Sequence, residues 1–213
     1  MKVSKIGHCC LVIEHNDTLI LTDPGSFSTG QNKIRGLSAV LITHEHADHF
    51  HIESLKTVLN NNPGIRIITN NAVHSILEKE GISSEVVGGG ESGDVHGIEV
   101  RGFGTQHEKV FGNEPNVENT GYLIGNKLFY PGDALHNPGT SVDILALPVS
   151  GPWLSMSDAL AYARELAPQS VFPVHEGLLN EQGEEITYRW ASTVLEKLNI
   201  KFIALKKGSS HTF

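Results

Sequence analysis

Hydrophobic and polar positions alternate with a period of two at the start of the chain. Short runs rich in Val, Ile and Leu predict strands at residues 3–6, 10–14 and 19–23, with a hairpin turn at residues 16–17. A β-branched, aliphatic run at residues 38–43 predicts a strand that is buried on both faces. The chain therefore begins as a β-rich structure.

After residue 50 the apolar positions recur at helical spacing. Ile52, Leu55 and Leu59 fall on one face of a helix that we expect to end near residues 60–64, where three Asn precede Pro and Gly. Helices and strands alternate from there on. The expected helices cover residues 72–80, about 155–166 with Ser155 or Ser157 as cap, and 184–198. The expected strands cover residues 66–69, 84–87, 97–103, 121–124, 127–130, 142–147, 170–173 and 201–205.

A glycine-rich segment, residues 88–93, lies between two of these strands. A phosphate-binding loop would require a following Lys and the start of a helix, and the sequence offers neither. We therefore interpret the segment as the turn of a hairpin between strands 84–87 and 97–103. The chain shows no repeat in residue identity, no linker and no low-complexity segment, so one domain over residues 1–213 is expected.

Composition narrows the classes of function. With 39% hydrophobic and 19% charged residues and no long apolar run, the sequence is typical of a soluble globular protein, and we expect a cytoplasmic one. The net charge of −8 argues against nucleic-acid binding, which depends on Lys and Arg. We therefore expect a small-molecule substrate and no nucleic-acid or membrane partner. The only cysteines, Cys9 and Cys10, are interpreted as small buried apolar residues.

Four metal-ligand side chains follow directly after the buried strand 38–43. They are His44, His46, Asp48 and His49. Imidazole and carboxylate suit Zn²⁺ and similar ions, and the short spacers let the first two bind one metal while the last two face another. A polar loop that merely opens a helix would not require this spacing. The cluster therefore predicts half of a two-metal site.

Three later strands also end in ligand side chains. His107 follows strand 97–103, Asp133 follows strand 127–130 and His175 follows strand 170–173. Proteins of the α/β class build their sites where strands end. With the first cluster these residues supply five His and two Asp, the donor set of a dinuclear site with a bridging carboxylate.

The order of these residues resembles the metallo-β-lactamase fold superfamily. That family's pattern is an Asp that ends an early strand, here Asp23, then H-x-H-x-D-H, then a later His, Asp and His. The resemblance implies an α/β fold, a four-layer αββα sandwich. The ligand assignment that it implies is His44, His46 and His107 for one metal, Asp48, His49 and His175 for the other, and Asp133 as the bridge. It also implies that Asp23 holds the histidine loop without touching metal.

Three segments resemble one branch of this superfamily, the short hydrolases related to L-ascorbate-6-phosphate lactonase. They are Ile6-Gly7-His8-Cys9-Cys10, Tyr130-Pro131-Gly132-Asp133 and residues 147–152. The metallo-β-lactamases with a Cys at the fourth motif are disfavoured, because Asp133 stands there. Proteins of this kind often self-associate, so a homo-oligomer belongs to the expectations.

Together, the donor set and the resemblance predict a metal-dependent hydrolase. Two divalent ions, Zn²⁺ by expectation with Mn²⁺ or Fe as alternatives, would lower the pKa of a shared water to about 7 and so provide a bridging hydroxide as nucleophile. Asp48 would orient that hydroxide and pass its proton to the leaving group. The bond cleaved would be an ester, lactone or phosphodiester in a small substrate.

Some residues and functions stay open at this stage. His8, His136 and Trp153 are candidates for substrate contact or support of the ligands, with loop or packing roles as the alternatives. An iron-dependent redox protein of the same fold would use the same ligands, and a metal-binding protein without turnover is a third alternative. Loops such as residues 108–120 and 150–156 would shape the pocket.

Overall fold

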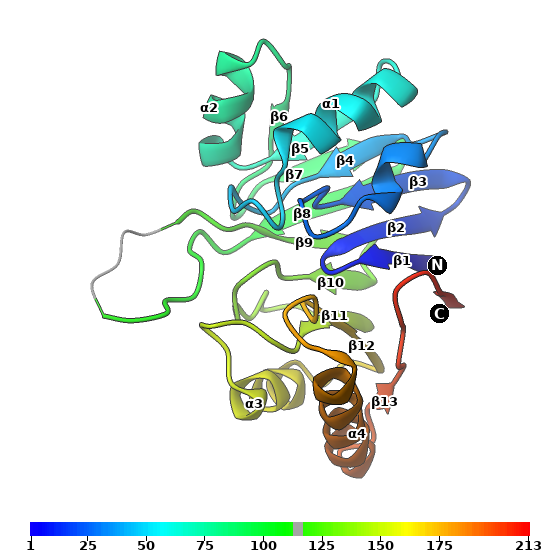
Figure 1. The fold of residues 1–213 in the computed structure, drawn as a ribbon, viewed down its shortest axis with the longest axis vertical. Helices are drawn as coiled ribbons and strands as arrows, with labels where there is room; N and C mark the ends of the chain where they lie inside the picture. The colour runs from blue at the N-terminus through cyan, green and yellow to red at the C-terminus, as the bar shows by residue number, and fades with distance from the viewer. Residues whose placement is uncertain (113–116) are drawn as a thin grey trace.

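Two seven-stranded sheets pack face to face, and helices cover the outer face of each (Figure 1). This architecture comes from a computed structural model, which describes residues 1–112 and 117–213. Part of the loop 108–120, which we expected to shape the pocket, lies outside the described residues. The strand orders are β14-β1-β2-β3-β4-β5-β6 in the first sheet and β13-β12-β11-β10-β9-β8-β7 in the second.

The first sheet joins an antiparallel half to a parallel half. The antiparallel strands are β14 (Ser210–Thr212), β1 (Lys2–Gly7), β2 (Cys10–His15) and β3 (Thr18–Thr22). The parallel strands that continue from β3 are β4 (Ala39–Leu41), β5 (Arg66–Thr69) and β6 (Glu85–Val86). Its helices are α1 (Ile52–Asn61), α2 (Asn71–Lys79) and the short 3-10 helix η1 (Gly30–Lys33).

The second sheet has the same two halves. Its antiparallel strands are β7 (Ser92–Val95), β8 (Ile98–Phe103), β9 (Gly121–Ile124) and β10 (Leu128–Tyr130). The parallel strands that continue from β10 are β11 (Ile144–Pro148), β12 (Ser170–Val174) and β13 (Lys201–Phe202). Its helices are α3 (Met156–Leu166) and α4 (Glu181–Lys197). Within the described ranges, none of the helices has the length and the apolar composition that crossing a membrane requires.

The helix starts follow from their capping residues. Ser155, one of the two expected caps, accepts a hydrogen bond from the Asp158 backbone N–H and so begins α3. The longer helix α4 begins at Glu181, earlier than the expected residue 184, because the Asn180 side chain accepts from the Gly183 N–H.

Three apolar clusters fill the spaces between the four layers. Strand β2 shows how the sequence separates them, since successive side chains of a strand point to opposite faces. Leu11 and Ile13 belong to the cluster between the sheets, whereas Cys10 belongs to the cluster under α1 and α2. A third cluster joins the second sheet to α3 and α4 and includes Leu145 and Ala163. The predicted αββα sandwich is confirmed.

The predicted hairpin of strands 84–87 and 97–103 is wrong. Strand β6 pairs with β5 in the first sheet, whereas β8 pairs with β7 and β9 in the second. The glycine-rich segment therefore passes from one sheet to the other, and its last residues form β7. A Cβ on Gly102 would lie 2.2 Å from the Gly88 carbonyl oxygen, so the glycines are needed for a close backbone approach at this crossing.

A buried lysine links the two sheets beside the end of β12. Lys5 Nζ donates hydrogen bonds to the carbonyls of Pro173 at 2.7 Å and Leu205 at 3.1 Å. It also lies 2.5 Å from Oε1 of Glu176, which is 6% exposed. Burial lowers the pKa of Lys5, and the neighbouring carboxylate of Glu176 opposes that shift. Because Glu176 follows His175, the ion pair anchors the segment that carries this histidine.

We expect Lys5→Met to destabilise the protein by about 3 kcal/mol, because it leaves the buried Glu176 carboxylate without its cation. Urea unfolding measures the change. The matched control is Lys2→Met in the same strand, since Lys2 and Glu14 form an exposed pair and its loss should cost less than about 1 kcal/mol. Equal losses in the two variants would contradict an anchoring role for the buried pair.

Candidate metal centre

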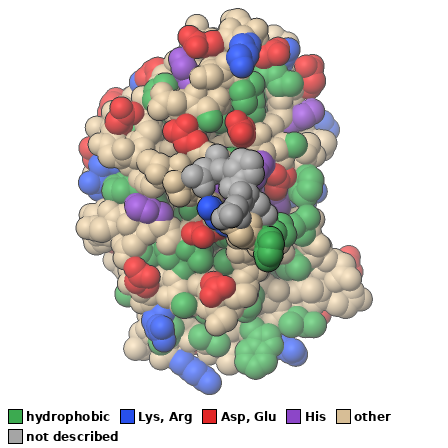
Figure 2. Space-filling view, turned by 90° about the vertical axis from the view of Figure 1, so that its left-hand side faces the viewer, with side chains coloured by type: hydrophobic (Ala, Val, Ile, Leu, Met, Phe, Trp, Pro, Cys, Tyr) green, Lys and Arg blue, Asp and Glu red, His purple; other side chains and the backbone are tan. Residues whose placement is uncertain are grey.

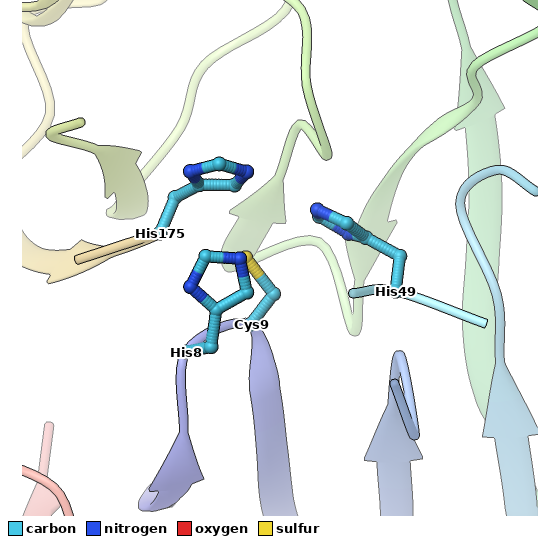
Figure 3. Close-up of side chains that lie close together, drawn as sticks. All are labelled: His8, Cys9, His49 and His175. Carbon is cyan, nitrogen blue, oxygen red and sulfur yellow. The ribbon is translucent and has the colours of Figure 1, made fainter. Parts of the chain in front are cut away.

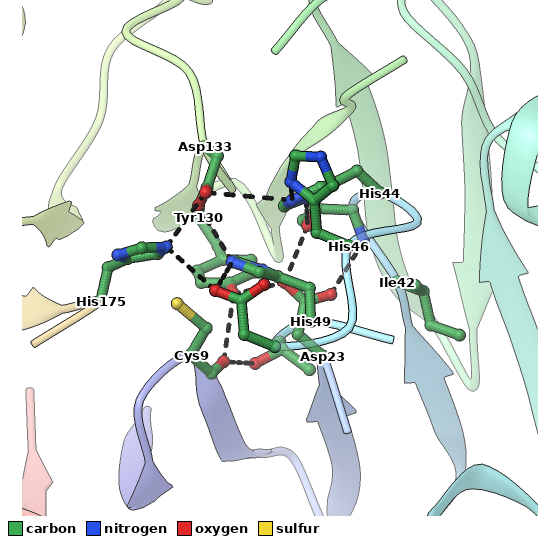
Figure 4. Close-up of polar contacts among 12 residues, drawn as sticks. Cys9, Asp23, Ile42, His44, His46, His49, Tyr130, Asp133 and His175 are labelled. Atoms are coloured by element: carbon green, nitrogen blue, oxygen red, sulfur yellow. Dashed lines mark hydrogen bonds and ion pairs between the residues drawn. The ribbon is translucent and has the colours of Figure 1, made fainter. Parts of the chain in front are cut away.

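The histidine cluster lies in the loop between β4 and α1, and Asp23 at the end of β3 holds it (Figure 4). Oδ1 of Asp23 accepts from the Thr43 N–H at 2.8 Å, and Oδ2 accepts from the Thr43 hydroxyl at 2.8 Å and the Tyr130 hydroxyl at 2.5 Å. Oδ2 also lies 2.7 Å from Nδ1 of His49. This bond fixes the His49 ring and leaves its Nε2 for the site.

Backbone contacts fold the loop tightly. The N–H groups of His49 and Phe50 both donate to the His46 carbonyl, at 2.9 and 2.7 Å. The preceding loop packs directly on this turn, because a Cβ on Gly25 would lie 1.8 Å from the carbonyl oxygen of Asp48. Only glycine permits this approach, which fixes the backbone from which Asp48 and His49 extend.

Three side chains from the second sheet meet this loop. His107 follows β8, Asp133 follows β10 and His175 follows β12. Oδ2 of Asp133 lies 3.2 Å from Nε2 of His107 and 3.0 Å from Nε2 of His175, and Oδ1 lies 3.0 Å from Nε2 of His49. The structure thus brings Asp133 between imidazoles from both sheets.

All seven expected ligands come together. The ligand atoms of His44, His46, His107 and Asp133 lie within 4.8 Å of one another. On the other side of Asp133, Oδ2 of Asp48 lies 3.5 Å from Nε2 of His175 and 3.8 Å from Nε2 of His49. The residues form two adjacent groups that share Asp133.

Several buried nitrogen and oxygen atoms in these groups, each of which could bind a metal, lack a hydrogen bond of good geometry. Among the described residues these atoms are Nε2 of His49, both ring nitrogens of His175 and Oδ1 of Asp133. Buried polar atoms are rarely left without a partner, because the lost solvation is costly. Imidazole nitrogens and carboxylate oxygens that face a common space are a suitable donor set for divalent metal ions. The residues therefore fit a metal.

The charges inside the site favour the metal-binding form of some ligands. Burial works against the ionised form of Asp133, but the neighbouring His49, His107 and His175 hold the pKa of that carboxyl well below its usual range. Burial and the charge of His49 lower the pKa of His44 well below its usual value, so that imidazole is neutral. An ionised carboxylate and a neutral imidazole are the forms that bind metal.

The pKa of His49 is shifted in the opposite direction from that of His44. Burial would lower its pKa, but Asp133, Cys9 and Asp23 raise it well above the usual value, which favours the protonated imidazole. A metal bound at Nε2 must displace that proton.

His8 positions Asp48. The Gly177 N–H donates to Nδ1 of His8 at 3.0 Å, so the ring proton is on Nε2, which lies 3.1 Å from Oδ2 of Asp48 and donates to it. A Cβ on Gly177 would lie 2.6 Å from Nδ1 of His8, so glycine is required at this contact. Both ring nitrogens of His8 are therefore engaged.

Three residues of the site have left-handed backbone conformations that are unusual for side chains other than Gly. The φ angles are 48° at His8, 37° at Asp23 and 65° at His175. Such residues cost on the order of 1–3 kcal/mol each and are found where the surrounding structure fixes them for a purpose. Their concentration here supports a functional role for this end of the sandwich.

A cavity of about 370 Å³ opens onto the ligands. Besides His46, Asp48, His107, Asp133 and His175, it is lined by the apolar residues Phe27, Ala47, Val110, Pro152, Trp153 and Leu178. The Trp153 Nε1–H donates to Oδ2 of Asp133 at 3.0 Å, so this candidate residue lies in the cavity wall. The sequence did not single out Phe27 and Leu178, because isolated apolar residues in loops carry no distinctive pattern.

The face that carries these loops is seen in Figure 2, where histidine, acidic and hydrophobic side chains gather around its centre. Phe27 is 46% exposed and Leu178 is 52% exposed, and both line the cavity that opens onto the ligands. Exposed apolar groups beside a polar centre are typical of a ligand-binding surface.

His136 does not reach this cavity. It lines a neighbouring one of about 690 Å³, together with Gln106, Glu108 and Glu165. Its backbone carbonyl accepts a hydrogen bond from the Tyr162 hydroxyl at 2.7 Å. The structure thus separates His136 from the seven ligands, while it brings His8 and Trp153 into contact with them.

Comparisons with known proteins agree with this geometry. A family profile described as "Beta-lactamase superfamily domain" matches residues 2–175. Protein Rv0786c of Mycobacterium tuberculosis is 35% identical over 218 residues, and the match covers all of both chains. A UPF0173 metal-dependent hydrolase of Carboxydothermus hydrogenoformans is 24% identical, with 82% of this chain and 84% of that protein covered.

Solved structures share the fold. Igni18, a metallo hydrolase of the archaeon Ignicoccus hospitalis, superimposes with a TM-score of 0.76 at 18% identity. The match covers 100% of this chain and 97% of that one.

Proposed function

This chain belongs to the beta-lactamase superfamily, and we propose that it is a dinuclear hydrolase that cleaves an ester or lactone bond in a small, partly apolar substrate. Metal-dependent hydrolysis on the metallo-β-lactamase fold is its activity, in agreement with the UPF0173 relatives that are named metal-dependent hydrolases. The dinuclear centre and the class of bond are our proposal.

One observation carries the dinuclear centre. Asp133 has one oxygen 3.0 Å from Nε2 of His49 and the other 3.2 Å from Nε2 of His107. The oxygen near His107 also lies 3.0 Å from Nε2 of His175, so the carboxylate reaches imidazoles of both groups, as a ligand shared by two metals would. Divalent ions held there would supply activation of water and polarisation of the bond to be cleaved.

Asp48 would carry the proton transfers. It lines the cavity, its side chain is 21% exposed, and its Oδ2 accepts from His8. A carboxylate in this position can accept a proton from the attacking water and pass it to the leaving group. His8 would keep Asp48 oriented toward the cavity during both transfers.

The cavity wall favours an uncharged substrate. Its described lining contains apolar side chains and the ligands themselves, but neither Lys nor Arg. A phosphate group is usually recognised by such cations, whereas an ester or lactone with an apolar substituent can pack against Trp153 and Phe27. Phosphodiesters are therefore the less favoured of the expected substrates.

We expect purified protein to contain close to two metal ions per chain and to hydrolyse carboxylic esters or lactones with apolar substituents. Chelation should reduce the rate at least about 100-fold, and added Zn²⁺ should restore it, because metal ions supply several kcal/mol of stabilisation to the transition state. Elemental analysis and an assay panel that includes phosphodiesters measure both properties.

Two outcomes would overturn the proposal in different ways. Hydrolysis with a single ion per chain would remove the dinuclear centre but keep the hydrolase. Iron, visible absorption and no hydrolysis across the panel would favour the iron-dependent redox protein instead.

A further inference from the structure

A cysteine lies under the ligands that were assigned to the second metal (Figure 3). The ligand atoms of Cys9, His49, His175 and His8 all lie within 4.8 Å of one another. Cys9 is 1% exposed, His49 is 0% exposed and His175 is 2% exposed. In Figure 3 the Cys9 sulfur points up from the turn between β1 and β2 into the space that the imidazoles surround.

Two of these imidazoles present unpartnered nitrogens to that space. Nε2 of His49 and Nε2 of His175 make no hydrogen bond of good geometry with any described residue, although each lies 3.0 Å from an oxygen of Asp133. Nδ1 of His49 is already bonded to Asp23, so Nε2 is the atom left for a ligand. Ligand atoms that lie close together with no well-formed hydrogen bond between them are expected where each one points at the same metal ion.

His8 is not available as a further ligand. Its Nδ1 accepts from the Gly177 N–H and its Nε2 donates to Asp48. The imidazoles that can bind an ion beside Cys9 are therefore those of His49 and His175. The carboxylates expected to bind the same ion, Asp48 and Asp133, have oxygens 3.5 and 3.0 Å from Nε2 of His175.

The backbone of Cys9 is fixed by its surroundings. Its carbonyl accepts from the Thr22 hydroxyl at 2.9 Å and from the Tyr130 hydroxyl at 3.1 Å. Tyr130 also bonds Asp23, which holds His49. One hydrogen-bond network therefore fixes the positions of both Cys9 and His49. Residues that bind a metal directly are usually oriented by such hydrogen bonds.

We propose that Cys9 supplies a thiolate ligand to the metal that His49 and His175 hold. The proposal rests on the metal centre of the proposed function and changes the chemistry of its second site. On binding, the S–H bond would break with release of the proton to solvent, and the sulfur would donate an electron pair to the metal. A soft thiolate favours Zn²⁺ over Mn²⁺, so the site would select against the harder ion.

Cobalt spectroscopy of the intact protein tests the proposal, because a thiolate bound to Co²⁺ gives a strong near-ultraviolet charge-transfer band that imidazole and carboxylate do not. We expect the band in the protein loaded with two Co²⁺ ions per chain. Cys9→Ala should lose it and bind the second Co²⁺ at least about tenfold more weakly.

The adjacent cysteine offers a matched control. Cys10 is equally buried, but it is the first residue of β2 and its side chain lies in the apolar cluster under α1 and α2. Cys10→Ala should therefore keep the band at full strength. A protein with two bound Co²⁺ ions and no band, or a band that persists in Cys9→Ala or disappears in both variants, overturns the role of Cys9. Failure to bind Co²⁺ at all, without chelator-sensitive hydrolysis, would instead overturn the proposed metal centre together with it.

Discussion

Asp133→Asn is expected to lower kcat/KM at least about 1,000-fold and to leave the purified protein with less than its full complement of metal. The carboxylate faces His49 with one oxygen and His107 and His175 with the other, so its charge serves both groups of ligands. A metal centre supplies several kcal/mol to a hydrolytic transition state, and each 1.4 kcal/mol is about a factor of ten in rate. Elemental analysis and steady-state kinetics measure the two losses.

The amide is a poor replacement for a further reason. Oδ2 of Asp133 accepts a hydrogen bond from the Trp153 indole N–H. In one orientation the NH₂ group of Asn would face the Trp153 N–H, and in the other it would face His49. In either orientation a hydrogen-bond donor replaces an oxygen that its neighbour needs as an acceptor. Asp17→Asn, in an exposed turn, is the control for removal of one negative charge. Asp133→Asn protein with two metals and unchanged kinetics would exclude the bridging role.

The ligand loop could be predicted from the sequence because its ligands and its backbone turn depend only on residues that are close together in the sequence. His44, His46, Asp48 and His49 lie within six positions after a buried strand, and the backbone turn that closes on the His46 carbonyl needs only neighbouring residues. His107, Asp133 and His175 were found by the same rule, since each follows a strand of the second sheet. The rule works because the ends of these strands meet at one edge of the sandwich.

Strand pairing could not be predicted in the same way. β14 pairs with β1 at the opposite end of the chain, with Val3 opposite His211, and its three residues show no hydrophobic alternation. The glycine-rich segment has the composition of a hairpin turn, but only the pairing of β6 with β5 and of β7 with β8 shows that it crosses between the sheets. Both features depend on partners that are distant in the sequence.

Cys9 shows a limit of residue-by-residue interpretation. It follows β1 and His8 directly, so the rule that found His107 and His175 applies to it as well. Cys9 belongs to the apolar cluster between the sheets and Cys10 to the one under α1 and α2, and the pair was interpreted as two small buried apolar residues. Cys9 lies in the turn before β2 and Cys10 is the first residue of β2, so the adjacent cysteines reach different layers, and only the structure separates their surroundings.

Asp23 and His8 hold two of the ligands of the second group, His49 and Asp48, in similar ways. Asp23 bonds Nδ1 of His49, and His8 bonds Oδ2 of Asp48, each from a left-handed backbone position. Both residues stand at strand ends that the hydrogen bonds of the first sheet keep in place. The first sheet thereby holds the His49 ring and the Asp48 carboxylate in the orientations that they must keep during catalysis.

Asp48→Asn is expected to lower kcat about 100- to 1,000-fold, with a smaller change in KM. The amide can still accept from His8, but it cannot take a proton from the attacking water, and loss of such a group typically has an effect of this size. The second metal should also bind more weakly, which titration with Zn²⁺ will measure separately from the rate at saturating metal. Glu45→Gln is the matched control, because Glu45 is an exposed carboxylate of the same loop, and its kcat should be unchanged. If Asp48→Asn protein saturated with metal kept its full kcat, Asp48 would act only as a ligand, and the proton transfers would have to be assigned to another residue of the cavity.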